Sequence, residues 1–180
     1  MKYCLTDETM EFSDRVLHRI KSLAEIRTRD VRVGDLGGWV ESEENLSQDG
    51  NSWIFPEGKV YGQAKVYENG HVSNHAEVYD QAEIYGDAGA GGYARVFGAA
   101  RIYDSGYVMG SVMIFDEAKI FGSAEIFDHA KIYGHAQVCG HARVSGKAEV
   151  FGDAHVCDNA FVMHEAKVKT RVFGNDRVYS

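Results

Sequence analysis

The sequence predicts an all-β fold: a single-stranded parallel β-helix, left-handed and triangular, with about six coils of 18 residues and a small N-terminal cap. Three observations predict it. An aliphatic residue recurs every six positions, a small residue follows it four positions later, and the third position is usually Gly or Asp. An α-helix needs apolar residues at a period of 3.6, and six is not a multiple of that period.

The repeat covers most of the chain without an insertion. The aliphatic positions run in steps of six from Val60 to Val162, and Ala90 is the one exception to Val or Ile. The small residue is Ala or Gly except at Val112. With Ile54 to Lys59 placed in front, the run comprises nineteen hexads, from 54 to 167. Short strands joined by tight bends are therefore expected, with three hexads closing one coil and coils stacked at about 4.8 Å.

The ends depart from this period, so three regions are expected. Residues 1–45 form an N-terminal capping segment, because the end coil of a solenoid exposes its core and unpaired backbone. Within this segment, 16–23 is predicted to be a strand or a short helix. Residues 46–171 form the solenoid. The period slips at 168–171 and resumes at Val172, so 172–180 is an end segment that closes the last coil or docks on a partner.

Composition narrows the class of protein. Of the 180 residues, 44% are hydrophobic and 26% are charged, which is enough for a core. The net charge of −8 argues against a nucleic-acid polymer or an anionic membrane as partner. Three Cys do not make a secreted disulfide framework, and the N-terminus has no apolar leader segment. We therefore expect a soluble protein of the cytoplasm.

One stretch near the N-terminus carries a family resemblance. The segments 34–41 (Gly-Asp-Leu-Gly-Gly-Trp-Val-Glu), 44–48 (Glu-Asn-Leu-Ser-Gln) and 50–54 (Gly-Asn-Ser-Trp-Ile), with the Val-Tyr-Gly-x-Ala-Lys repeats that follow, resemble the YdcK-like β-solenoid proteins of bacteria, phages and prophages. The resemblance covers nearly the whole chain. It implies the fold, a bacterial or phage source and a cytoplasmic setting, and it implies no activity or catalytic residue.

The second residue of each hexad is expected to point to solvent, which sorts these residues into three ladders along the coils. The first ladder is aromatic throughout and is our candidate oligomer interface, for a trimer or a dimer: Tyr61, Tyr79, Phe97, Phe115, Tyr133 and Phe151. A continuous apolar stripe is unusual on a monomer, although stacked rings also stabilise neighbouring coils. The third ladder is mixed: Phe55, Ser73, Gly91, Met109, Phe127, Ser145 and Met163.

A candidate ligand site lies around the second ladder, which reads Tyr67, Tyr85, Tyr103, Phe121, Cys139 and Cys157. Aromatic rings beside cations could stack a base and hold the phosphate of a small nucleotide. The alternative, and the simpler interpretation, is a solvated face whose charged residues form ion pairs. The glycines of 86–92 leave a notch on the third face. The candidate residues are Tyr85, Tyr103, Arg101, Lys119, His71 and Tyr107. Cys139 and Cys157 lie one coil apart, close enough for a disulfide, but free thiols are expected in the cytosol.

Catalytic residues, a metal and a cofactor are not expected. His129, His135 and His141 occupy consecutive hexads and so face different sides of the triangle, too far apart for zinc. Hexapeptide-repeat acyltransferases usually extrude a loop that places a His, and no insertion exists between 54 and 167.

The expected function is therefore a non-catalytic, oligomeric binding protein that sequesters a ligand, such as a nucleotide immune signal, or a host protein. The alternatives are an acyltransferase-like enzyme with an active site between subunits and a purely structural scaffold. An inter-subunit metal site also stays open.

Overall fold

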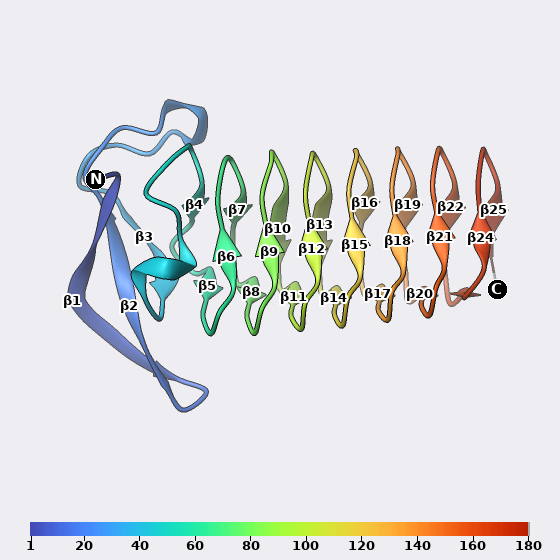
Figure 1. The fold of residues 1–180 in the computed structure, drawn as a ribbon, viewed down its shortest axis with the longest axis horizontal. Coiled ribbons are helices and arrows are strands. Elements are labelled where there is room, and N and C mark those ends of the chain that lie inside the picture. The colour runs from blue at the N-terminus through green and yellow to red at the C-terminus, as the bar shows by residue number, and fades with distance from the viewer. Residues whose placement is uncertain (180) are drawn as a thin grey trace.

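The computed structural model describes residues 1–179, which form a β-solenoid of stacked coils preceded by a β-hairpin (Figure 1). Three sheets run along the solenoid. The ten-stranded sheet contains, in spatial order, β1 Tyr3–Phe12, β2 Arg15–Ser22, β3 Leu36–Val40, β5 Lys59–Val60, β8 Glu77–Val78, β11 Arg95–Val96, β14 Met113–Ile114, β17 Lys131–Ile132, β20 Glu149–Val150 and β23 Lys167–Val168.

The other two sheets consist of short parallel strands only. The eight-stranded sheet contains β25 Arg177–Val178, β22 Phe161–Val162, β19 Arg143–Val144, β16 Glu125–Ile126, β13 Tyr107–Gly110, β10 Gly89–Gly92, β7 His71–Val72 and β4 Trp53–Ile54. The seven-stranded sheet contains β24 Arg171–Val172, β21 His155–Val156, β18 Gln137–Val138, β15 Lys119–Ile120, β12 Arg101–Ile102, β9 Glu83–Ile84 and β6 Lys65–Val66. The described residues also include two short 3-10 helices, η1 (Arg27–Arg29) and η2 (Glu43–Asn45).

Strands pair in parallel with an offset of 18 residues, which confirms the all-β parallel solenoid predicted from the hexads. Arg95, for example, pairs with Glu77 on one side and with Met113 on the other. Every side chain between the ends of the solenoid therefore lies above the residue 18 positions earlier. This register arranges the surface of the protein in columns.

The number of coils is about eight, and the expected six was too low. Parallel pairing begins earlier than the hexads suggest, because β3 already pairs with β5 and Leu46 bridges to Val66, at an offset of 20 instead of 18. It also continues to the end of the described chain. There the offset shortens to 16, so His155 pairs with Arg171 and Phe161 with Arg177. The slip in the period therefore shortens a coil without ending the sheets.

The core is made by the first and fifth residues of each hexad. The aliphatic side chains from Val60 to Val162 are fully buried, as are the small residues from Ala64 to Ala160, including the exceptional Val112. Ala90 is also fully buried. A narrow interior of this kind favours a small side chain at each corner, which explains the alanine column, with Val112 as its exception.

From Gly62 to His164, the third residue of each hexad turns the corner with a left-handed backbone conformation. Gly98 has a φ of +67° and Asp80 a φ of +58°, which only Gly, Asn and Asp adopt at low cost. Where one coil carries a polar side chain and the next a glycine, the side chain accepts the glycine N–H. These pairs are Glu68 with Gly86, Asn74 with Gly92, Asp80 with Gly98, Asp104 with Gly122, Asp116 with Gly134, Asp128 with Gly146 and Asp158 with Gly174.

The β1–β2 hairpin caps the N-terminal end of the solenoid. Its strands are antiparallel, and β2 continues into the ten-stranded sheet through an antiparallel pairing with β3. The segment 16–23, expected to be a strand or a short helix, thus contributes most of strand β2. Tyr3 is fully buried, and its hydroxyl donates to the carbonyl of Leu46 at 2.7 Å. Together with Ile20, it covers the first coil.

No helix within residues 1–179 is long and apolar enough to cross a membrane.

Candidate functional site: the aromatic ladders and the hairpin groove

The first ladder is a continuous stack of six aromatic rings. Each residue follows a strand of the ten-stranded sheet, from Tyr61 after β5 to Phe151 after β20. Successive ring centroids are 4.9–5.3 Å apart, and the ring planes agree within 9°. The rings therefore stack along the whole series, over about 25 Å, as the 18-residue register predicted. Aromatic pairs of this kind contribute about 0.5–1.5 kcal/mol each beyond burial of area.

The hairpin covers only the first ring of this ladder. Phe12 meets Tyr61 edge to face, with centroids 5.8 Å apart, and Leu17 and Trp39 complete the buried cluster. Tyr61 is 7% exposed, whereas the rings from Tyr79 to Phe151 are half-buried. The ladder therefore has a closed N-terminal end and an open remainder.

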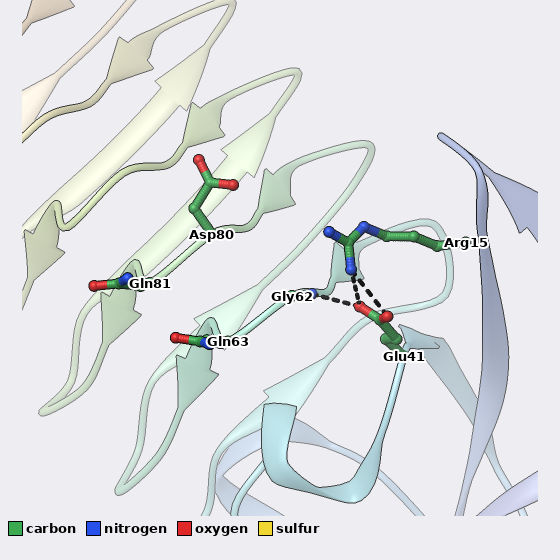
Figure 2. Close-up of a pocket in the computed structure, with 6 residues that line it drawn as sticks. All are labelled: Arg15, Glu41, Gly62, Gln63, Asp80 and Gln81. Atoms are coloured by element: carbon green, nitrogen blue, oxygen red, sulfur yellow. Dashed lines mark hydrogen bonds and ion pairs between the residues drawn. The ribbon is translucent and has the colours of Figure 1, made fainter.

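A polar groove lies where the hairpin meets the corner of the solenoid (Figure 2). It encloses about 520 Å³ and is lined by Arg15, Glu41, Gly62, Gln63, Asp80 and Gln81. The Arg15 guanidinium donates to both carboxylate oxygens of Glu41 at 2.7 and 2.9 Å, and the amide of Gly62 donates to Glu41 at 2.7 Å. Since Glu41 neutralises Arg15, the groove holds no excess positive charge. Sequence analysis missed this groove, because hexad periodicity does not reveal where the hairpin lies.

A column of mixed charge runs beside the first ladder on the same sheet. It is formed by the residue two positions before each ring: Lys59, Glu77, Arg95, Met113, Lys131 and Glu149. Within the chain, Arg95 lies 4.0 Å from Glu77, and Lys167 lies 3.7 Å from Glu149. In both pairs the cation is exposed and the carboxylate is largely covered, with side-chain exposures of 58% for Arg95 and 19% for Glu77.

The second ladder begins as a stack of aromatic rings and ends in a disulfide. The rings of Tyr67, Tyr85, Tyr103 and Phe121 stack at 4.8–5.1 Å. Cys139 and Cys157 form a disulfide bond across a Cα separation of 4.6 Å. The expectation of free thiols at these two positions was therefore wrong. The stacking register brings the two sulfurs together, whereas that expectation rested on an assumed reducing compartment.

The residues proposed to bind a ligand fall into two groups. Tyr85 and Tyr103 lie near Arg101, whose charge opposes the rise in the pKa of both phenols that burial causes. Arg101 is ion-paired with Glu83 at 3.2 Å, and Lys119 is its strand neighbour on β15. This first group lies along the seven-stranded sheet and the corner that follows it.

His71 and Tyr107 form the second group, on the eight-stranded sheet. Their ring centroids are 6.2 Å apart across Gly89. A Cβ on Gly89 would lie 2.2 Å from the His71 ring, and one on Gly91 would lie 3.5 Å from the Tyr107 hydroxyl. The notch expected at the glycines of 86–92 is thus occupied by these two side chains.

The capping segment reaches His71 as well. Burial and, to a smaller extent, the nearby Arg29 guanidinium lower the pKa of His71 to about 4, although a hydrogen bond with the backbone of Ala88 acts in the opposite direction. Arg29 in turn donates a hydrogen bond to the carbonyl of Asn69. His71 is therefore neutral near pH 7, and it serves here as a packing residue over Gly89.

Histidines and carboxylates do not gather into a metal site. Among the residues that the structure describes, no three His, Cys, Asp or Glu side chains come close enough to share an ion. His135 pairs instead with Glu117 at 3.3 Å.

The fold and these surfaces define a class of protein: a β-solenoid whose outer face carries ordered columns of side chains. The sequence matches no known family model, and no curated protein resembles it significantly.

The buried phenols make stability sensitive to alkaline pH. Burial raises the pKa of Tyr3 to about 12, with a further contribution from Glu43, against an ordinary value of 10. Between pH 10 and 12 the unfolded chain therefore releases this proton while the folded chain keeps it. The stabilisation is fully present below pH 10 and is lost as the pH rises to 12.

We expect Tyr3→Phe to reduce this alkaline loss of stability, measured by urea unfolding at pH 8, 10 and 11.5. Tyr93→Phe is the matched control, because Tyr93 is 64% exposed. Equal slopes of stability against pH for the wild type and Tyr3→Phe would contradict the assignment.

Proposed function

We propose that this chain is a non-catalytic, oligomeric binding protein that uses its rigid solenoid to present side-chain columns to partners. The observation that carries the proposal is the open part of the first ladder, in which the five rings from Tyr79 to Phe151 are stacked, half-buried and left uncovered by the hairpin. Contiguous apolar surfaces on soluble proteins commonly mark interaction sites. The partner that we favour for the first ladder is the protein itself.

The hairpin supports this use of the ladder. Phe12 meets Tyr61 edge to face, and Met10 packs against the cluster that Tyr61 forms with Leu17 and Trp39, so the chain already buries one end of its own ladder under apolar side chains. An apolar partner surface would bury the remaining rings in the same way. Burial of apolar area stabilises such a contact by about 25 cal/mol per Å² before the costs of association.

Replacing Phe97 and Phe115 by Lys tests the proposal. The double variant is expected to change the protein from an oligomer to a monomer, because two charges would have to be desolvated in the centre of the contact. Native mass spectrometry and analytical ultracentrifugation give the mass. Tyr103→Lys with Phe121→Lys is the matched control, since it puts the same charges on the second ladder.

Two results would reject the ladder as the interface: an unchanged mass in the Phe97→Lys and Phe115→Lys variant, or a monomeric wild type. Circular dichroism checks whether both double variants keep the β-solenoid.

We also propose the family to which this protein belongs. The resemblance in 34–54 supports membership of the YdcK-like β-solenoid proteins, a bacterial or phage source and a cytoplasmic location. The disulfide between Cys139 and Cys157 is more typical of oxidising compartments, and it weighs against that location.

A ligand-sequestering version of the function has narrower support. Stacked Tyr85 and Tyr103 lie beside Arg101 and Lys119, an arrangement that suits a base and a phosphate, but Glu83 already pairs with Arg101. Thermal shift distinguishes the alternatives, since a ligand selective for the folded state raises the melting temperature. A shift with nucleotides favours sequestration, a shift with acyl-CoA favours an enzyme between subunits, and no shift favours the scaffold.

A further inference from the structure

The charges beside the first ladder have an order that selects one arrangement of two chains. This inference rests on the proposed self-association and goes beyond it by naming the partner surface, the orientation and the register. The column reads Lys59, Glu77, Arg95, Met113, Lys131, Glu149, one residue per coil. Reversing this order, as an end-for-end rotation does, places opposite charges against each other.

We propose that the first ladder docks against the first ladder of a second copy of this chain, antiparallel, about a twofold axis that passes between Phe97 and Phe115. An axis that crosses the ladder at right angles turns one copy end for end. It sets each column against the same column of the other copy, in reverse order. In the middle of the contact, Tyr79 and Phe97 then face Tyr133 of the partner subunit and Phe115 of the partner subunit.

In this register, the charged column is complementary to itself. Glu77 faces Lys131 of the partner subunit, and Lys59 faces Glu149 of the partner subunit. Arg95 faces Met113 of the partner subunit, so no like charges meet. Because the axis is twofold, each ion pair forms twice per dimer.

Neighbouring registers are disfavoured by the same column. A shift of one coil in one direction places Lys59 against Lys131 of the partner subunit. A shift in the other direction places Glu77 against the partner's Glu149 and Arg95 against the partner's Lys131. Like charges facing each other at an interface are costly and suppress the wrong alignment. In a parallel pairing this charged column would face a different column of the partner subunit. The pairs of opposite charge described above would then not form.

The hairpin is compatible with the proposed register. Phe151 of the partner subunit faces the end of the ladder that Phe12 covers, so apolar side chains meet there too. The open rings would thus lie between two hairpins, one from each copy. This gives the ladder an occupant along its whole length.

Two charge reversals, Glu77→Lys and Lys131→Glu, test the register. Each variant alone places like charges against each other twice per dimer, so its dissociation constant is expected to rise by about tenfold or more. An equimolar mixture restores the dimer as a heterodimer, because Lys at 77 of one chain then faces Glu at 131 of the other. Sedimentation equilibrium at low salt gives the dissociation constant of each variant and of their mixture, and native mass spectrometry identifies the heterodimer.

Glu83→Lys is the matched control, because Glu83 pairs with Arg101 just as Glu77 pairs with Arg95, but on the seven-stranded sheet. It is expected to leave the dimer unchanged. A dimeric wild type that dissociates on Phe97→Lys with Phe115→Lys, but is not rescued by the mixture, would overturn the register while the proposed function stands. A trimeric wild type would overturn the twofold arrangement, and a monomeric wild type would overturn both.

Discussion

Replacing Ile120 by Ala is expected to destabilise the protein by about 2–5 kcal/mol. Ile120 is fully buried in strand β15, between Ile102 of the previous coil and Val138 of the next. Truncation leaves a cavity that these neighbours cannot fill, because the sheet hydrogen bonds hold the coils at a set spacing. The free energy of unfolding from urea titration gives the cost.

The position of Ile120 adds a second, qualitative expectation. In a solenoid each coil contacts mainly its neighbours, so a weakened coil in the middle divides the array into two blocks. Hydrogen exchange is therefore expected to show reduced protection on both sides of Ile120, while distant coils stay protected. Ile120→Val, which keeps most of the volume, should cost about 0.5–1.5 kcal/mol. A loss of less than 1 kcal/mol on Ile120→Ala would show that the core relaxes easily and is not close-packed.

Replacing Trp53 by Ala is expected to cost about 3–5 kcal/mol and to loosen the cap. Trp53 is among the largest fully buried side chains, with 1% exposure. Its ring packs against β3, where a Cβ on Gly37 would lie 2.7 Å from the indole and 2.6 Å from Ile20. The indole therefore joins the first coil to the capping segment.

Hydrogen exchange in β1 and β2 measures the loosening. Loss of Trp53 should raise exchange rates in the hairpin more than in the coils beyond β11, because the cavity lies under the cap. Trp53→Phe is the control that keeps an aromatic ring, and it should retain most of the protection. A uniform increase of hydrogen exchange along the whole chain after Trp53→Ala would contradict the role of Trp53 in joining the cap to the first coil. It would show that the cap and the solenoid unfold as a single cooperative unit.

Much of the architecture was accessible from the order of residues alone. The hexads predicted parallel coils of 18 residues, and from this followed the buried column of Val and Ile and the stacking of Phe97 on Phe115. These features follow because one offset of 18 residues governs the strand pairs from Trp53 with His71 to Glu149 with Lys167. The number of coils was underestimated, because the strands at both ends pair in parallel at other offsets, 20 between Trp39 and Lys59 and 16 between His155 and Arg171, which a strict period of six does not reveal.

The candidate sites were predicted less completely. Which side chains of different columns contact each other depends on the path of the capping segment and on the side-chain rotamers. The proposed ligand residues divide between two sheets, and His71 covers the glycines that were expected to leave a notch. The groove at Arg15 and Glu41 arises where the hairpin tip meets a solenoid corner, a contact across 26 positions with no periodic signal.

The sequence by itself determined the columns: which residues face inward, which face outward, and which follow one another along the axis. A single hydrogen-bonded offset repeated from coil to coil is enough to specify these relations. Only the tertiary structure decided where the hairpin covers the first ladder, how Cys139 and Cys157 are bonded, and which grooves stay open. Those outcomes depend on contacts between periodic and non-periodic segments, which no local pattern encodes.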